Sequence, residues 1–234
     1  MSDRPQSEDP ADDETDLLAA AAHEIKNALG PLAMTIQLVE RQVEGGQPVA
    51  AADLTFARHQ VRRLSALVDD LLDQTRASRG QLTFRPRPTD LAAWIAEAVA
   101  TFRRGQPAAV VVVETPAVPV VASVDPGRMQ QVLANLLGNA VRYAPVGSPV
   151  TVAVRRMPPA TARIEVRDRG PGLSRDEQAR VFDRFVRGAA SEGTSGLGLG
   201  LYLCRAIVEQ HGARIGVDSS PGAGATFWID IQAP

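Results

Sequence analysis

The chain has 234 residues, of which 44% are hydrophobic and 22% are charged, and its net charge is -2. This length is sufficient for one or two globular domains with apolar cores, and the balanced charge argues against nucleic acid or an anionic membrane as a partner. The single cysteine, Cys204, excludes a disulfide framework within the chain and favours a reducing, cytoplasmic setting. Because no apolar run approaches the ~20 residues of a membrane helix and no signal peptide is evident, we expect no membrane segment.

The first third of the sequence predicts two long helices. Residues 1–15 are polar and acidic, contain two prolines and lack apolar periodicity, so we expect a disordered leader there. A helix is expected at residues 15–44. A second helix is expected at residues 51–78, after a glycine-containing connection at residues 45–48.

Apolar residues in both helices recur at alternating steps of three and four, which is the pattern of a helical-bundle seam. The seam positions are Leu18, Ala22, Ile25, Leu29, Leu32, Ile36, Val39 and Val43 in the first helix, and Leu54, Ala57, Val61, Leu64, Val68 and Leu71 in the second. Two such helices with a short connection form an antiparallel hairpin, here residues 16–79. Since one hairpin cannot surround its own seam, we expect two copies to pair as a homodimeric four-helix bundle.

After residues 79–80 the pattern changes to alternating strands and helices. Strands are expected at residues 82–87, 110–114, 118–124, 150–155, 162–167, 214–218 and 225–231, and helices at residues 91–102, 126–143, 175–182 and 199–210. This order predicts a second, α+β domain over residues 80–234, a sandwich of one mixed sheet with helices on one face.

The first helix places an imidazole beside a carboxylate. His23 follows a seam position by one residue, so we expect its ring on the exposed side, and Asn27 lies one turn further along. A neutral imidazole nitrogen is a nucleophile, and the neighbouring Glu24 can take up the proton that is released after attack. On its own, an exposed histidine is more often a solvated surface residue, so this reading depends on what the second domain supplies.

The helix expected at residues 126–143 carries three carboxamides on one face, Gln131, Asn135 and Asn139, while its other face is apolar. Amide oxygens can ligate Mg²⁺, and amide hydrogens can hold phosphate oxygens. A plain solvent-facing side is the alternative interpretation for this helix alone.

Two glycine-rich segments follow. Asp168 precedes Gly170 and Gly172 at the end of an expected strand, where its carboxylate can accept a hydrogen bond from an exocyclic amine. A second run of glycines, at residues 193–200, allows close backbone approach to a ligand just before a helix whose N-terminus favours phosphate. Each segment alone also fits an ordinary turn or linker.

Together, and in this order, these segments resemble the motifs of two-component sensor histidine kinase transmitters. The HEIKN sequence at residues 23–27 resembles the H-box, residues 135–143 resemble the N-box, and residues 168–172 resemble the G1 box. Residues 182–185 resemble the F-box, residues 196–200 the G2 box, and residues 222–226 the last glycine box. The resemblance covers about residues 15–234.

The resemblance implies a Bergerat or GHKL-type ATPase fold for the second domain, with ATP and Mg²⁺ as cofactors. It places Mg²⁺ on Asn135, and Gln131, in the same amide row, is a second candidate for the metal. It implies that Asn139 and Arg142 lie near the phosphates, where the family often has a lysine at the arginine position. The remaining cofactor-binding residues that it implies are Tyr143 against the adenine, Asp168 on the adenine amine, Arg187 near the γ-phosphate, and Gly170, Gly172, Gly196, Leu197, Gly198, Leu199, Gly200 and Thr226.

The implied activity is autophosphorylation of His23 from ATP with Glu24 as the base, followed by transfer to an aspartate on the receiver domain of a response regulator. Asn27 is expected to orient a water for phosphatase activity, and a separate sensor protein would supply the input. Two alternatives stay open. An anti-sigma-type serine kinase shares the ATPase fold but gives no reason for a hairpin with a His-Glu pair. A non-catalytic or phosphatase-only adaptor would bind a receiver domain but gives no reason for an intact amide row.

Overall fold

The computed structural model describes residues 10–78, 82–186 and 198–233, except for the side chains of residues 10–20, 23 and 24 and of residues 63, 66, 70, 74, 77 and 78. The chain divides into two compact units. The described part of the first unit ends at Thr75, and the second unit begins at Arg76. No helix among the described residues is both long and apolar enough to span a membrane.

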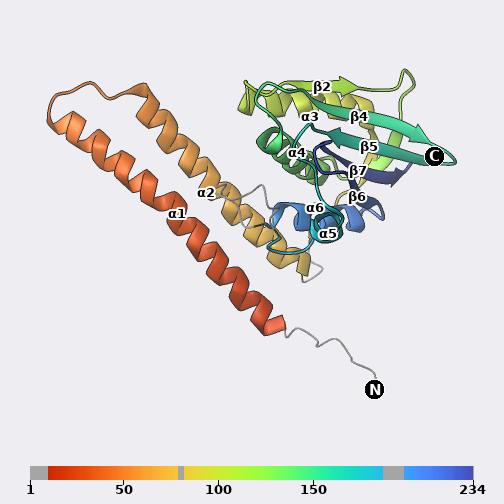
Figure 1. Ribbon diagram of the computed structural model, residues 1–234, viewed down its shortest axis with the longest axis horizontal. Coiled ribbons are helices and arrows are strands. Elements are labelled where there is room, and N and C mark those ends of the chain that lie inside the picture. The colour runs from red at the N-terminus through yellow and green to blue at the C-terminus, as the bar shows by residue number, and fades with distance from the viewer. Residues whose placement is uncertain (1–9, 79–81, 187–197, 234) are drawn as a thin grey trace. The chain divides into compact units, whose positions relative to one another are not determined.

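The first unit is an antiparallel hairpin of α1 (Pro10–Glu44) and α2 (Ala51–Ser78) (Figure 1). α2 has the expected bounds, but α1 begins at Pro10, so the expectation of a disordered leader up to residue 15 was wrong for residues 10–15. Proline fits the first turn of a helix, where an amide hydrogen would have no acceptor within the helix. Acidic residues such as those at positions 12–14 stabilise a helix near its N-terminus, which is the positive end of the helix dipole. α1 ends at Glu44, and Gly46 in the turn that follows has a φ of 64°, which glycine adopts at little cost.

The apolar seam of the hairpin separates into two stripes. One stripe is shielded within the chain: Ala21, Ala28 and Leu67 are buried, and Ile25, Leu32, Val39, Ala57, Leu64 and Leu71 are half-buried. The other stripe remains 45–62% exposed and recurs every seven residues, at Leu29, Ile36 and Val43 of α1 and at Leu54, Val61 and Val68 of α2. Seven-residue spacing keeps a stripe on one side of a helix, so each helix presents a second apolar side that one copy of the chain leaves open.

The second unit contains β1 (Arg87–Asp90), α3 (Leu91–Gly105), β2 (Val111–Glu114), β3 (Val121–Val124), α4 (Pro126–Tyr143), β4 (Val150–Met157), β5 (Thr161–Arg167), α5 (Arg175–Arg180), α6 (Gly200–Gln210), β6 (Arg214–Ser219) and β7 (Ala225–Gln232). Five strands form a mixed sheet in the order β2-β4-β5-β7-β6, in which only β2 and β4 are parallel. β1 and β3 pair separately as an antiparallel ribbon. The expectation of a single sheet was therefore wrong for these two strands.

The first strand of this unit lies at residues 87–90, not at the expected residues 82–87, because side chains bind the backbone of the preceding segment. The side-chain amide of Gln210 donates to the carbonyl of Leu82 (3.0 Å), and the carboxylate of Asp125 accepts the backbone N–H of Arg85 (2.8 Å). Backbone groups that would otherwise need a strand partner are thus satisfied.

α4 has the expected bounds because strong local signals fix its start. The carboxylate of Asp125 accepts the backbone N–H groups of Gly127 (2.9 Å) and Arg128 (3.1 Å), and Pro126 occupies the first helical position. The apolar side is buried in the core through Met129, Val132, Leu133, Leu136, Leu137 and Ala140. Burial of this side fixes the direction in which the opposite, amide-bearing side faces.

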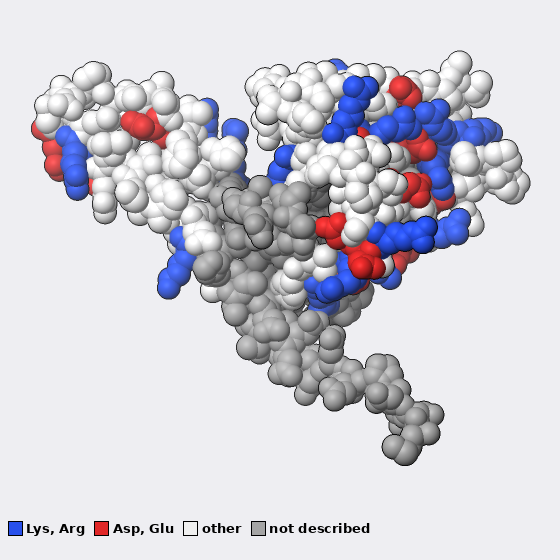
Figure 2. Space-filling model, in the orientation of Figure 1, with Lys and Arg blue, Asp and Glu red and all other residues white. Residues whose placement is uncertain are grey.

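The five-stranded sheet has an apolar face and a polar face. α3, α4 and α6 lie on the apolar face (Figure 1), where the strands contribute Val152, Val154, Ile164, Val166, Phe227, Ile229 and Ile231 to one core. On the other face Arg163 donates to both carboxylate oxygens of Asp230 (2.7 and 2.8 Å), and its guanidinium lies 4.5 Å from the ring centre of Trp228. Basic and acidic side chains are interspersed over the visible surface of this unit (Figure 2).

Trp228 crosses the edge strand β6 at Gly216. A Cβ atom at Gly216 would lie 2.2 Å from Cζ2 of the indole, which is far closer than any real contact. Only glycine at this position lets the indole lie against the strand backbone.

We predict that Gly216→Ala lowers the free energy of unfolding by about 1–3 kcal/mol, because the added methyl group pushes the indole off the strand. The matched control is Gly138→Ala in α4, where a Cβ atom meets nothing within 4 Å. This control should raise the free energy of unfolding by about 0.5–1 kcal/mol through the better helix propensity of alanine. Urea denaturation of both variants measures these changes, and an unchanged Gly216→Ala protein would contradict the close packing of Trp228.

Candidate functional site

Both glycine-rich segments contact α4. A Cβ atom at Gly200 would lie 3.1 Å from Oδ1 of Asn135, and a Cβ atom at Gly170 would lie 3.0 Å from the carbonyl oxygen of Tyr143. The start of α6 therefore lies against the amide row, and the loop after β5 lies against the last turn of α4. The structure thus brings Asn135, Tyr143, Gly170 and Gly200 together along one helix.

The amide row on α4 consists of Gln131, Asn135 and Asn139, and Arg142 and Tyr143 follow it in the last turn of the helix. All five side chains are at least partly accessible. Gln131, Asn135, Asn139 and Tyr143 are half-buried, and Arg142 is exposed. Oε1 of Gln131 accepts a hydrogen bond from Arg128 (3.1 Å), so Gln131 would have to exchange this bond to ligate a metal ion.

The amide side chains on α4 fit a magnesium ion that takes most of its ligands from phosphate and water. Among the described residues, no group of three or more histidine, cysteine, aspartate or glutamate side chains could hold a metal ion. Mg²⁺ in nucleotide sites binds few protein oxygens and keeps phosphate oxygens and water as its other ligands. The side-chain oxygen of Asn135, next to Gly200, is of the type that could serve as such a ligand.

Asp168 is a buried carboxylate at the end of β5, and only 7% of the residue is exposed. Burial raises the pKa of its carboxyl group above the ordinary value, and hydrogen bonds from the backbone N–H groups of Gly170 (2.7 Å) and Ala225 (3.3 Å) oppose this rise. In the described part of the chain both bonds end on Oδ1. Oδ2 is therefore the oxygen that can accept a donor from a ligand.

Two glycines let separate backbone segments pass in contact beside Asp168. A Cβ atom at Gly172 would lie 2.0 Å from the carbonyl oxygen of Ser220, and one at Gly224 would lie 2.2 Å from the carbonyl oxygen of Asp168. Both glycines have positive φ, 73° and 79°. Thr226 is half-buried on β7, next to this crossing.

The segment before α6 packs against the end of the F-box. A Cβ atom at Gly198 would lie 2.9 Å from the carbonyl carbon of Phe185, and Phe185 itself has a φ of 60°, which is unusual for a bulky residue. Leu199 is buried and directly precedes α6. Arg187, Gly196 and Leu197 lie outside the described residues.

The residues of the H-box lie on α1. The backbone is helical at His23 and Glu24, but their side chains lie outside the described part of the structure. Asn27 is exposed. Four residues of an α-helix correspond to about 40° of rotation about its axis, so Asn27 lies on the same side of α1 as His23.

Several residues that the sequence analysis did not identify organise the surroundings of Asp168. Gln178 and Ser219 bind backbone groups of the loop after β5 and of the turn between β6 and β7, the two segments that cross beside Asp168. Ser174 and Glu177 form a capping box at the start of α5. The Ser-x-x-Glu spacing is a sequence signal for this cap, whereas no local signal marks Gln178 or Ser219, because their partners lie up to 46 residues away.

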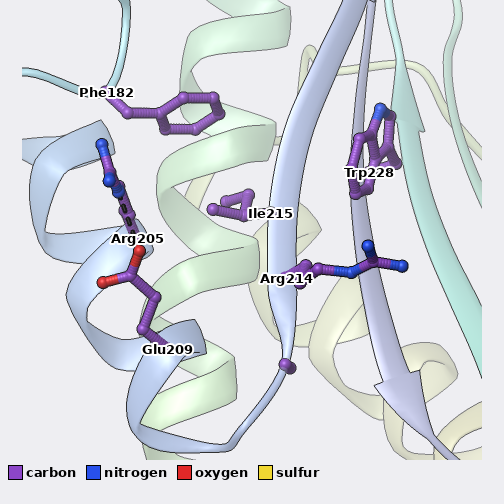
Figure 3. Close-up of a pocket in the computed structure, with 7 residues that line it drawn as sticks. Phe182, Arg205, Glu209, Arg214, Ile215 and Trp228 are labelled. Carbon is purple, nitrogen blue, oxygen red and sulfur yellow. Dashed lines mark hydrogen bonds and ion pairs between the residues drawn. The ribbon is translucent and has the colours of Figure 1, made fainter.

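A separate pocket lies between α6 and the edge of β6 and contains none of the predicted nucleotide-binding residues. It has a volume of about 270 Å³ and is lined by Phe182, Arg205, Glu209, Ala213, Arg214, Ile215 and Trp228 (Figure 3). Two of its three charged residues, Arg205 and Glu209, bind each other (2.9 Å). This volume lies just below that of usual ligand pockets, about 300–1,000 Å³, and none of the lining residues belongs to α4 or to the segments around Asp168.

Family models match both parts of the chain. The model of the His Kinase A (phospho-acceptor) domain matches residues 13–80, and the model of the histidine kinase-, DNA gyrase B- and HSP90-like ATPase matches residues 124–234.

The chain is similar to curated sensory kinases named SasA. The adaptive-response sensory kinase SasA of Synechococcus sp. (strain JA-2-3B'a(2-13)) is 30% identical over 237 residues, which cover 98% of this chain and 62% of the relative. SasA of Parasynechococcus marenigrum (strain WH8102) is 34% identical over 222 residues, which cover 92% of this chain and 56% of the relative. The chain thus spans about three-fifths of the length of these relatives.

Solved histidine kinases share the fold. The mycobacterial sensor histidine kinase MprB is 27% identical, with a TM-score of 0.57 over 63% of this chain and 98% of that chain. The Acinetobacter baumannii histidine kinase AdeS has a TM-score of 0.67 at 24% identity, over 90% of this chain and 97% of that chain. Histidine kinase ThkA in complex with response regulator protein TrrA has a TM-score of 0.69 at 21% identity, over 94% of this chain and 61% of that chain. The last two similarities concern the fold alone.

The helical hairpin, the amide row on α4 and the glycine-rich crossings around Asp168 therefore agree with both family models and with the curated relatives. The chain belongs to the two-component histidine kinase transmitters, with a phospho-acceptor region followed by a GHKL-type ATPase domain.

Proposed function

We propose that this chain is an ATP-dependent protein-histidine kinase that phosphorylates its own His23 and passes the phosphate to an aspartate on the receiver domain of a response regulator. The observation that carries the proposal is the buried carboxylate of Asp168, fixed through one oxygen and placed beside the amide-bearing helix α4. The match of residues 13–80 to a phospho-acceptor domain supplies the acceptor.

The ATPase domain would bind ATP by its base and its phosphates. Oδ2 of Asp168 accepts a hydrogen bond from the exocyclic amine of adenine, and Tyr143 lies against the ring. Asn139 and Arg142 bind phosphate oxygens, as does Arg187 outside the described residues. Mg²⁺ on Asn135, with Gln131 as a second candidate ligand, would neutralise charge on the phosphates. The glycine-rich segments, including Gly196 and Leu197, allow the backbone to approach the nucleotide.

In the chemical step, an unprotonated imidazole nitrogen of His23 forms a bond to the γ-phosphorus. The bond from the γ-phosphorus to the bridging oxygen breaks, and ADP leaves with the electron pair. The other imidazole nitrogen gives its proton to Glu24. Positioning of the reactants and neutralisation of phosphate charge supply most of the rate.

The second step would transfer the phosphoryl group from the imidazole to an aspartate carboxylate of the regulator. Histidine kinase ThkA, whose fold this chain shares, was solved in complex with a response regulator protein, TrrA. Asn27, exposed one turn from His23, would orient the water that removes phosphate from the regulator. A cytoplasmic location and a separate sensor protein stay proposals from the sequence.

The exposed stripe of the hairpin supports a homodimer. Leu29, Ile36, Leu54, Val61 and their neighbours in the stripe are 45–62% exposed in a single chain. A second hairpin that packs its own stripe against this one would bury both and complete a four-helix bundle.

We predict that His23→Gln abolishes labelling of the chain by [γ-³²P]ATP but leaves the affinity for Mg²⁺-ADP within about twofold of wild type, because glutamine offers no imidazole nitrogen and the nucleotide site lies in the other domain. Labelling is measured by autoradiography, and affinity by calorimetry. The matched variant Asn27→Ala should keep the label and lose regulator phosphatase activity. Phosphorylated His23→Gln would contradict the assignment of the acceptor.

We predict that Ile36→Asp converts the dimer to monomers, because a carboxylate in the centre of the exposed stripe would be buried without a partner. Sedimentation velocity measures the change. The control is Met34→Asp, which alters an exposed apolar residue (73%) on a different side of α1. Dissociation by both variants, or by neither, would contradict the stripe as the dimer interface.

We predict that the affinity for Mg²⁺-ADP falls as the pH is lowered, and that the fall begins above the pH at which an ordinary aspartate titrates. Burial raises the pKa of the Asp168 carboxyl. Once this group is protonated, it is a weaker acceptor for the hydrogen bond from the adenine amine. Asp168→Asn should bind weakly and show a flatter pH profile. Calorimetry between pH 4 and 8 tests both, and identical profiles would contradict this role.

A further inference from the structure

Two backbone segments form the surroundings of Asp168, and they are interlaced. The first is the loop after β5, residues 168–174, and the second is the turn between β6 and β7, residues 219–225. The backbone N–H of Asp168 donates to the carbonyl of Ala225 (2.9 Å), and the N–H of Gly222 donates to the carbonyl of Pro171 (2.6 Å). The carboxylate of Asp168 is thus held where the two segments cross.

The hydroxyl of Ser219 bridges the segments. Oγ of Ser219 accepts the backbone N–H of Leu173 (2.8 Å) in the loop and donates to the carbonyl of Gly224 (2.7 Å) in the turn. One hydroxyl group therefore uses both its donor and its acceptor capacity to fix the distance between the two segments.

The side chain of Gln178 forms a second bridge. Its Nε2 donates to the carbonyls of Leu173 (3.0 Å) and Ser174 (3.3 Å) in and at the end of the loop, and to the carbonyl of Ser219 (3.1 Å) at the start of the turn. Gln178 is half-buried on α5. Loss of this amide would leave three neighbouring carbonyls without its donor hydrogens.

The spacing of the segments controls the carboxylate. Oδ1 of Asp168 receives one N–H from each segment, Gly170 in the loop (2.7 Å) and Ala225 in the turn (3.3 Å). If the segments move apart, the longer bond from Ala225 is lost first, and the carboxylate is free to rotate about the bond that remains.

We propose that Gln178 and Ser219 are positioning residues of the nucleotide site, which orient the carboxylate of Asp168 toward the exocyclic amine of adenine. This inference rests on the proposed nucleotide-binding function. Both residues act through Asp168, and they determine how strongly the site prefers adenine to a purine with a carbonyl oxygen in place of the amine.

The test compares the affinities of the full chain for Mg²⁺-ADP and Mg²⁺-IDP, the inosine nucleotide, by calorimetry. The wild-type chain should prefer ADP, because the carboxylate meets a donor in adenine and an acceptor in hypoxanthine. In Gln178→Leu and in Ser219→Ala the affinity for ADP should fall about tenfold, the size expected for a misaligned hydrogen bond to a charged group. The affinity for IDP should change less than twofold, so that the preference largely disappears.

Two controls separate positioning from general damage to the fold. Ser219→Thr keeps the bridging hydroxyl and should keep the preference for ADP. Gln210→Leu removes another side-chain amide that donates to a backbone carbonyl, that of Leu82 (3.0 Å), and should also keep the preference. Thermal melting shows whether each variant is folded. If the Gln178→Leu protein does not fold, Ser219→Ala tests the inference independently.

An equal loss of ADP and IDP affinity in Gln178→Leu and Ser219→Ala, or an unchanged preference, would overturn the inference. Failure of the wild-type chain to bind either nucleotide would contradict the proposed function itself, and with it the basis of this inference.

Discussion

The ATPase domain depends on a carboxylate that is buried where two backbone segments cross. Burial makes the charged form of Asp168 costly, and backbone N–H groups from both segments, which donate to the same oxygen, partly offset this cost. That approach requires glycine at the crossings, since a Cβ atom at Gly224 would lie 2.2 Å from the carbonyl oxygen of Asp168. The glycine-rich boxes therefore have a physical role besides their proposed contact with nucleotide: they make room for the crossing that holds Asp168.

The phospho-acceptor hairpin is governed by a different constraint, the number of apolar stripes on each helix. A hairpin that stood alone would need one stripe per helix, and these helices have two. Residues such as Ala28 and Leu67 are buried in one chain, whereas Ile36 and Val61 remain about half exposed. The second stripe has a physical reason if a further pair of helices covers it, so the pattern of the hairpin favours the proposed dimer.

Elements defined by local signals could be predicted, and elements defined by distant contacts could not. The bounds of α4 follow from Asp125, Pro126 and helical periodicity, all of which lie within the helix or next to it. The separate β1–β3 ribbon could not be predicted, because the carbonyl of Leu82 is bound by Gln210, which is 128 residues away in the chain. The sequence predicts one seam where the structure has two stripes, because steps of three and four residues are common to both stripes.

In the candidate site, too, local motifs could be predicted from the sequence and distant contacts could not. Motif spacing was enough to select Asn135, Asp168 and the glycines, and the structure places the described ones around α4 and the end of β5. Spacing could not show that Arg128 occupies the side-chain oxygen of Gln131, or that Gln178 bridges two segments. The roles of all these site residues stay predictions, and the side chains of His23, Glu24 and Arg187 lie outside the described residues.

The central claim is that a nucleotide bound beside Asp168 phosphorylates an imidazole on α1. The most direct measurement is the chemical stability and position of the label after the wild-type chain is incubated with [γ-³²P]ATP and Mg²⁺. The account predicts a phosphoramidate, stable in base and lost in acid, that maps to the peptide containing His23. A label that is stable in acid, or that maps to a serine or threonine, would contradict it.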